Sequence, residues 1–95
     1  MTTENFRPAY VYIVECADGT FYTGWAYNPE DRAKRHNAGQ GAKYTRSRLP
    51  VQLVYQEALP DQTAARKREY ALKQLPRTAK LALIKTMPET AVPPA

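Results

Sequence analysis

One carboxylate in the second half of the chain stands where an apolar side chain would be expected. Ala65, Glu69 and Leu72 recur at intervals of four and three residues, which places them on one face of a predicted helix. A carboxylate on an inward face needs a partner, because burying it unpaired is costly in free energy. The partner could be an arginine in a salt bridge. It could also be a hard divalent cation such as Mg²⁺, which often takes only one or two carboxylates from protein.

Two tyrosines lie on the first two predicted strands, and the loop between these strands decides whether they share a face. With a two-residue loop, residues 18–19, Tyr12 and Tyr22 fall on opposite faces, because side chains alternate along a strand. With a three-residue loop, residues 17–19, and its glycine in the left-handed conformation, Val14 pairs with Tyr22. Both tyrosines then point to the same side, as shared chemistry requires.

An arginine and a histidine follow on a short predicted helix. Asn28-Pro29 opens this helix, because asparagine caps free amide groups and proline suits the first turn, and it runs to about Asn37. Arg32 and His36 are four residues apart and so share a face. On an exposed helix such side chains are more often solvated than catalytic, so their significance depends on what lies opposite them.

The distribution of charge favours an anionic partner. The net charge is +5 and the pI is near 9.5. Between residues 32 and 48 the chain carries six basic residues and no acid, with Tyr44 set among them. The basic residues are Arg32, Lys34, Arg35, Lys43, Arg46 and Arg48. A solvated charged face would usually interleave acids, whereas basic and aromatic side chains together are typical of a nucleic-acid-binding surface.

The 95 residues predict a single domain. We expect residues 1–8 and 87–95 to be flexible tails and residues 9–86 to form the domain. No apolar run approaches the ~18 to 20 residues of a membrane span, and the N-terminus lacks the apolar segment of a signal peptide. The single cysteine, Cys16, alternates with apolar residues and is predicted to be buried and reduced. These features predict a cytoplasmic protein that does not associate with membranes.

The remaining pattern predicts strands and helices in the order strand, strand, helix, strand, helix, helix. Their expected ranges are Tyr10–Cys16, Thr20–Trp25, Pro29–Asn37, Val51–Ala58, Gln62–Leu75 and Arg77–Thr86. Gly39 and Gly41 end the first helix, and residues 38–50 are expected to form a long basic loop. Asp61 caps the second helix and Pro76 ends it.

The sequence resembles the GIY-YIG nuclease family, specifically its small stand-alone, single-domain members, over roughly residues 9–84. The first motif of the family falls on Tyr10-Val11-Tyr12 and the second on Tyr22-Thr23-Gly24, followed by Arg32, His36 and Glu69. Tyr10 stands where the first motif has glycine, and Thr23 where the second often has isoleucine. The resemblance implies an α+β fold, with a small three-stranded antiparallel sheet flanked by about three helices.

The resemblance also implies a metal-dependent endonuclease that hydrolyses phosphodiester bonds. Tyr22 or Tyr12 would then take a proton from the attacking water, and Arg32 would hold phosphate oxygens. His36 is the other candidate for proton transfer. Glu69 would hold one Mg²⁺ or Mn²⁺ ion. Some family members carry an asparagine after the glutamate, but all three asparagines here precede it, so Lys73 is a possible substitute.

A set of basic and aromatic residues is then expected to position the nucleic acid. It comprises Lys34, Arg35, Lys43, Tyr44, Arg46, Arg48 and Lys73. DNA is favoured over RNA as the substrate, in the form of a flap, a branch or a single strand. The expected role is in DNA repair or recombination, and a protein partner is a further source of specificity. The alternatives are a non-catalytic nucleic-acid-binding module of the same fold and a protein-interaction domain.

Overall fold

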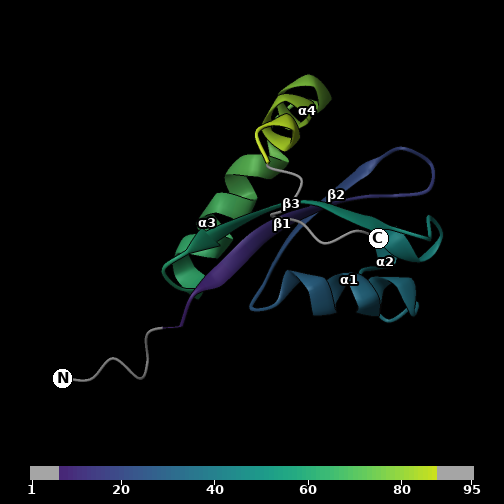
Figure 1. The fold of residues 1–95 in the computed structure, drawn as a ribbon, viewed down its shortest axis with the longest axis horizontal. Helices are drawn as coiled ribbons and strands as arrows, with labels where there is room; N and C mark the ends of the chain where they lie inside the picture. The colour runs from purple at the N-terminus through teal and green to yellow at the C-terminus, as the bar shows by residue number, and fades with distance from the viewer. Residues whose placement is uncertain (1–6, 88–95) are drawn as a thin grey trace.

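The computed structural model describes residues 7–87, in which a three-stranded antiparallel sheet has helices on both faces (Figure 1). The strand order is β2-β1-β3, so β1 is central and β2 forms an edge. The elements are β1 (Ala9–Glu15), β2 (Phe21–Ala26), α1 (Pro29–Asn37), α2 (Lys43–Arg46), β3 (Gln52–Leu59), α3 (Gln62–Lys73) and α4 (Arg77–Lys85). In Figure 1, α1 and α2 lie on one side of the sheet and α3 and α4 on the other. The predicted fold class is confirmed.

The β1–β2 hairpin has the register that places both tyrosines on one face. Val14 pairs with Tyr22, and Tyr12 pairs with Gly24. The amide of Cys16 donates to the carbonyl of Thr20 at 2.8 Å, which leaves three residues in the loop. Gly19 has φ of +85°, the left-handed conformation that the three-residue loop requires. The predicted three-residue loop is therefore confirmed.

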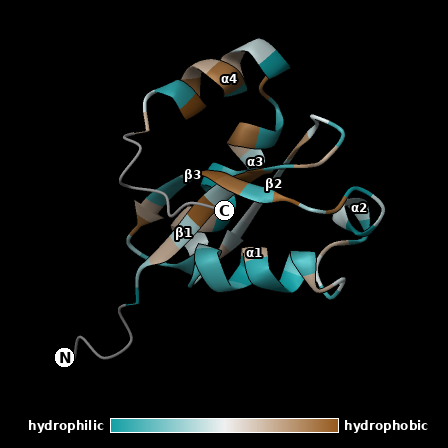
Figure 2. Ribbon diagram, turned by 45° about the vertical axis from the view of Figure 1, so that its right-hand side comes forward, coloured by the Kyte–Doolittle hydropathy of each residue, from teal (hydrophilic) through white to brown (hydrophobic). Residues whose placement is uncertain are grey.

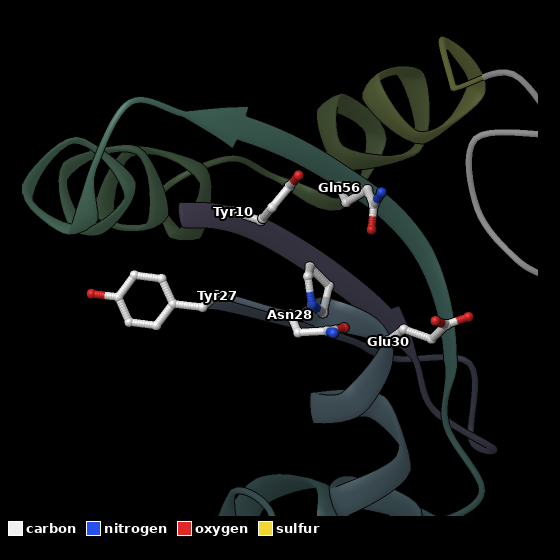
Figure 3. A pocket seen from close by; sticks show the side chains of 6 residues that line it. Tyr10, Tyr27, Asn28, Glu30 and Gln56 are labelled. Carbon is white, nitrogen blue, oxygen red and sulfur yellow. The ribbon is translucent and has the colours of Figure 1, made fainter. Parts of the chain in front are cut away.

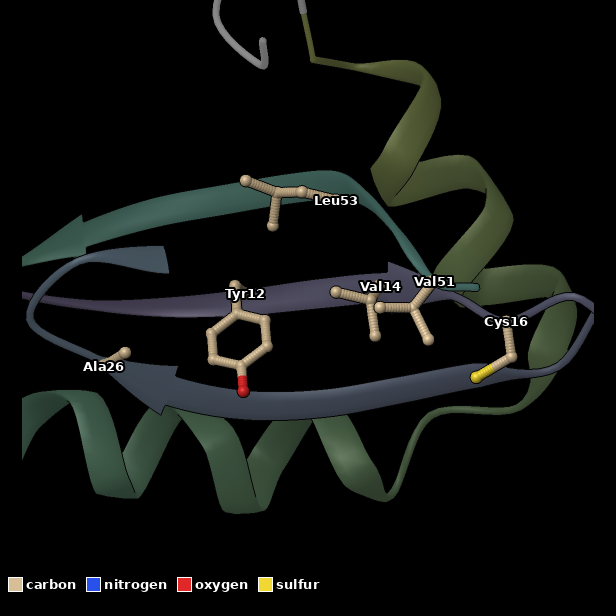
Figure 4. Packing of buried hydrophobic residues seen from close by; sticks show 6 residues of the cluster. All are labelled: Tyr12, Val14, Cys16, Ala26, Val51 and Leu53. Atoms are coloured by element: carbon tan, nitrogen blue, oxygen red, sulfur yellow. The ribbon is translucent and has the colours of Figure 1, made fainter. Parts of the chain in front are cut away.

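The alternation of side chains along β1 divides the core between the two faces of the sheet. Figure 4 shows the cluster on the face that α1 covers, which consists of Tyr12, Val14, Cys16, Ala26, Val51 and Leu53. The cluster on the opposite face includes Val11, Ile13 and Leu72, with Leu83 and Ile84 of α4 packed against it. The burial of Cys16 agrees with its prediction. Figure 2 shows the corresponding pattern, because α1 is largely hydrophilic while hydrophobic residues concentrate on the strands and α4.

The helix caps are those that the sequence predicts. Asn28 accepts a hydrogen bond from the amide of Asp31 at 3.1 Å, and Asp61 accepts one from the amide of Ala64 at 2.9 Å. The predicted loop at residues 38–50 contains a one-turn helix, α2, that the sequence did not predict, so residues 7–87 contain four helices. A four-residue helix is too short to produce a periodic pattern.

Most of the two predicted tails, residues 1–6 and 88–95, lies outside the described residues. Of the tail residues that the structure describes, Arg7 places its guanidinium 3.6 Å from the centre of the Tyr27 ring. At the other end, Met87 packs against the core cluster beneath α4. Within residues 7–87, every helix is too short or too polar to cross a membrane.

A glycine on β2 makes room for the side chain of Tyr12. Figure 4 shows Tyr12 extending from β1 across β2 toward the edge of the sheet. A Cβ atom on Gly24 would lie 2.7 Å from the Tyr12 Oη atom and 2.8 Å from its Cζ atom, which no real contact allows. The glycine of the second motif therefore lets the buried tyrosine ring pass over the edge strand.

We predict that Gly24→Ala destabilises the protein by about 1–3 kcal/mol, because the added methyl group overlaps the Tyr12 ring. In a Tyr12→Ala background the same substitution should instead raise stability by up to ~1 kcal/mol, since glycine within a strand is less favourable than alanine. Urea unfolding of the four proteins measures both effects. Equal effects of Gly24→Ala in the two backgrounds would contradict the overlap.

Candidate active site

Three of the predicted catalytic side chains are in mutual contact at the edge of the sheet. The Tyr12 Oη atom lies 2.9 Å from the His36 Nε2 atom, at hydrogen-bond distance. The ring centres of Tyr22 and His36 are 5.4 Å apart in an edge-to-face arrangement, and those of Tyr12 and Tyr22 are 6.5 Å apart. The structure therefore brings residues of β1, β2 and α1 into one cluster.

Both ring nitrogens of His36 are at hydrogen-bond distance from other groups of the protein. The backbone amide of Ala42 donates to the Nδ1 atom at 3.3 Å, and the Thr45 hydroxyl lies 2.9 Å from the same atom. A donating Ala42 amide requires the proton of the neutral ring on Nε2, whereas the Thr45 hydroxyl, which donates its one proton to the carbonyl of Ala42, can only accept from Nδ1 and requires the proton there. The hydrogen bond between Tyr12 and His36 forms with either neutral tautomer: His36 is the donor in the first and Tyr12 in the second.

The segment that supports His36 was not identified from the sequence as part of the site. Thr45 is fully buried and also donates to the carbonyl of Ala42 at 2.8 Å, which fixes α2 beneath the imidazole. A Cβ atom on Gly41 would overlap the His36 ring, so only glycine fits there. The sequence predicted Gly41 only as a helix end, and a lone threonine in a basic stretch gives no periodic signal.

Burial keeps both members of the tyrosine–histidine pair uncharged. Burial, and then the neighbouring Tyr22, raise the pKa of the Tyr12 phenol well above its usual range, although Arg32 opposes this through its charge and a hydrogen bond. Burial, and then the positive charge of Arg32, lower the pKa of the His36 imidazole. At neutral pH, Tyr12 is a phenol and His36 is a neutral imidazole.

A cleft of about 300 Å³ opens beside this pair. Its lining consists of Tyr22, Arg32, Arg35, His36, Gln40, Gly41 and Ala42. Arg32 is exposed, so its guanidinium is accessible to an anion that enters the cleft. The cleft combines a phenol, a guanidinium and an imidazole, which are groups that can bind a phosphate and move a proton.

Glu69 approaches the tyrosines from α3, on the other side of the sheet. Its carboxylate is only 19% exposed and forms a 2.9 Å ion pair with Lys73, so the partner is a lysine rather than an arginine. The hydrogen bond with Glu69 raises the pKa of Lys73. The Lys73 Nζ atom lies 6.0 Å from the centre of the Tyr22 ring. The negative charge of Glu69 also acts on Tyr12, which it makes harder to ionise.

Glu69 is the carboxylate of this site that could bind a metal ion. Within residues 7–87, no group of three or more histidine, cysteine, aspartate or glutamate side chains is placed so that it could hold a metal ion. A single half-buried carboxylate fits a hard cation such as Mg²⁺, which keeps several waters and takes further oxygens from a phosphate substrate. The cation would have to compete with Lys73 for Glu69.

The predicted nucleic-acid-binding residues divide into two groups. The first group is exposed and consists of Lys34, Arg35, Lys43, Arg46 and Lys73. The second group, Tyr44 and Arg48, is engaged within the protein. Arg48 forms a 3.1 Å ion pair with Asp18, and its guanidinium lies 4.0 Å from the centre of the Tyr44 ring. Tyr44 in turn stacks on Tyr22 at 6.1 Å between ring centres. These two residues fasten α2 to the hairpin.

A second cleft of about 300 Å³ lies at the start of α1 (Figure 3). Its lining consists of Tyr10, Tyr27, Asn28, Pro29, Glu30 and Gln56. It contains none of the five predicted catalytic residues, and its one carboxylate is that of Glu30. The cleft beside His36 is therefore the candidate active site.

A sequence model of the GIY-YIG catalytic domain matches residues 8–82. The chain therefore belongs to the GIY-YIG catalytic domain family, which supports a nuclease-type function in general terms. Its relatives include a UPF0213 protein from Streptococcus sanguinis, 51% identical over 87% of this chain and 95% of that protein. A UPF0213 protein from Staphylococcus saprophyticus is 56% identical over 79% of this chain and 92% of the relative.

Two solved structures resemble this one. The solution NMR structure of a UPF0213 protein from Bacillus halodurans is 44% identical, with a TM-score of 0.54 over 83% of this chain and 84% of that one. The solution NMR structure of a protein from E. faecalis is 41% identical, with a TM-score of 0.56, and the match covers 87% of this chain and 88% of that one. These likenesses agree with the predicted family and fold.

We predict that the protein loses stability as the pH falls through and below about 6.5. Folding lowers the pKa of His36, so the unfolded chain takes up a proton at a higher pH than the folded protein does. The free energy of unfolding therefore decreases as the pH decreases. His36 is the only histidine, so NMR titration of its imidazole should give a midpoint below the ~6.5 of an unperturbed histidine.

Urea unfolding at pH 7.5 and 5.5 provides the second measurement. His36→Gln removes the titrating group, so the difference in stability between the two pH values should shrink in this variant. An imidazole midpoint at or above the unperturbed value would contradict the buried neutral histidine.

Proposed function

We propose that this protein is a metal-dependent endonuclease that hydrolyses phosphodiester bonds in DNA. One observation carries the proposal: the buried, hydrogen-bonded pair of Tyr12 and His36 lies beside a cleft that His36, Tyr22 and the accessible Arg32 line. Membership of the GIY-YIG catalytic domain family supports the same function.

The groups in the cleft suggest different roles for the two tyrosines. The scissile phosphate would bind Arg32, whose guanidinium can hold two oxygens and stabilise the charge that develops in the transition state. Burial raises the pKa of Tyr12 and keeps it a phenol, so it would donate a hydrogen bond rather than accept a proton. Tyr22, which is part of the cleft wall, is then the candidate general base for the attacking water. His36 would act as a positioning residue for Tyr12.

Glu69 would hold the Mg²⁺ or Mn²⁺ ion, together with water and phosphate oxygens. Such an ion, when bound, polarises the phosphoryl group and neutralises charge on the leaving oxygen. Lys73 would have to release the carboxylate, and its own charge would then be available to a neighbouring phosphate.

We propose that the exposed cations of α1 and α2 contact the substrate. They would bind the phosphate backbone without recognising the base sequence. We therefore expect selection of DNA by its shape, as at a flap, branch or single strand, in repair or recombination. DNA is favoured over RNA, and a protein partner could add specificity.

The second candidate function is a non-catalytic nucleic-acid-binding module. The ion pair between Glu69 and Lys73 favours it, because a carboxylate that stays paired with lysine cannot hold a metal ion. The cationic surface would then serve binding alone.

We predict that the protein cleaves labelled DNA in the presence of Mg²⁺ or Mn²⁺, and that chelation or the substitution Glu69→Gln abolishes cleavage. A panel of single-stranded, duplex, flap and branched DNA and RNA, analysed by gel electrophoresis, gives the substrate preference. Glu15→Gln is the matched control, because it removes an exposed carboxylate at the end of β1 and should leave cleavage unchanged.

Binding by Glu69→Gln, measured without metal, should equal that of the native protein, because the substitution keeps the cationic surface. Metal-independent binding with no cleavage by either protein would reject the nuclease and support the binding module. Cleavage by Glu69→Gln at the native rate would exclude Glu69 as the metal ligand.

A further inference from the structure

The most exposed aromatic side chain in the described part of the chain lies outside the site considered so far. Tyr70, on α3, is 71% exposed, whereas the only other exposed large hydrophobic residue between positions 7 and 87 is Tyr44, at 39%. Tyr70 has no hydrogen-bond or ring partner among these residues, and most of its surface is open to solvent. Tyr44 already contacts Tyr22 and Arg48, so a base could stack on it only by displacing them.

Cations surround Tyr70 along α3. Arg66 precedes it by four residues and Lys73 follows it by three, so these three side chains share one face of the helix. Arg66 is exposed and has no ion-pair partner among the described residues. An isolated exposed tyrosine would need no explanation, but a tyrosine between two cations matches the composition of nucleic-acid-binding surfaces.

The positive charge continues from α3 into α4. From residue 70 to residue 87 the chain contains four basic residues and no acid: Lys73, Arg77, Lys80 and Lys85. Arg77 donates to the carbonyl of Gly19 at 2.8 Å, and its guanidinium lies 4.7 Å from the centre of the Phe21 ring, which fixes the start of α4 against the hairpin. Lys80 is partly buried, and the charge of Lys73 contributes to lowering its pKa, so the two cations are close.

We call this region the α3–α4 surface, which consists of Arg66, Tyr70, Lys73, Arg77 and Lys80. It adjoins the candidate active site, because Lys73 contacts Glu69 at 2.9 Å and lies 6.0 Å from the Tyr22 ring centre. Figure 1 shows α3 and α4 on the opposite side of the sheet from α1 and α2. The site therefore lies between two cationic surfaces, of which the α3–α4 surface has the accessible ring.

We propose that the α3–α4 surface binds the nucleic acid next to the cleavage site, with Tyr70 stacked on an unpaired base. The neighbouring cations hold the phosphates of the same nucleotides. This inference rests on the proposed function, because it assumes a nucleic-acid substrate. Only a base outside a duplex exposes its face to a protein side chain, so Tyr70 selects substrates with unpaired nucleotides near the scissile bond.

The test is the affinity of the full chain for fluorescently labelled DNA, measured by anisotropy in EDTA so that no cleavage occurs. The probes are a 20-nucleotide single strand, a duplex with a single-stranded flap and a fully paired duplex. Tyr70→Ala should weaken binding of the first two probes about 5- to 160-fold, the range expected for loss of one stacked base. Tyr70→Phe keeps the ring and should bind within about twofold of the native protein.

The paired duplex should bind native protein and both variants alike. Since Tyr70 is exposed, Tyr70→Ala should fold normally, which circular dichroism checks. The logarithm of the single-strand binding constant falls linearly with the logarithm of the salt concentration. Arg66→Ala should reduce the size of this slope by about 0.7, the value of one phosphate contact.

Native affinity in Tyr70→Ala for all probes would overturn the proposal, as would equal weakening by Tyr70→Ala and Tyr70→Phe. Tyr70-dependent binding without cleavage would support this surface while rejecting the nuclease. Cleavage with Tyr70-independent binding would support the nuclease while rejecting this surface.

Discussion

The hydrogen bond between Tyr12 and His36 is the interaction on which the arrangement of the candidate site depends. Both side chains are buried, so loss of either partner would leave a polar group unsatisfied away from water, which is costly. The bond joins the central strand to α1 over an edge strand, and two glycines make it possible. Gly24 lets the tyrosine ring cross β2, and Gly41 leaves space for the imidazole. The geometry of two short glycine-containing segments therefore fixes the chemistry of the pair.

The position of β2 at the edge of the sheet explains how so small a domain can gather groups from both of its faces. Arg32 reaches the tyrosines from the α1 side, whereas Glu69 and Lys73 reach them from the α3 side. In the absence of substrate the lysine neutralises the carboxylate, so the site as a whole is positive. A positive site between two cationic surfaces suits a polyanion that passes along the edge of the sheet.

The sequence predicted those features that follow from local rules. Loop length and strand alternation gave the face shared by Tyr12 and Tyr22, and an interrupted apolar stripe predicted that the Glu69 carboxylate lies inward and has a partner. The support of His36 by Thr45 could not be predicted, because it depends on how a nonrepetitive segment folds back in three dimensions. The pair between Glu69 and Lys73 has the ordinary four-residue helical spacing and was open to prediction. The exposure of an aromatic side chain, by contrast, is decided by tertiary packing.

The role of the two tyrosines in catalysis is best measured as the single-turnover rate of DNA cleavage by Tyr22→Phe and Tyr12→Phe, at saturating metal and equal binding. We expect both variants to fold and each to lose at least about 100-fold in rate, the lower end of the contribution expected from a positioned proton-transfer group. A variant that retains the native rate would show that its tyrosine takes no part in the reaction, and retention in both would reject the proposed active site.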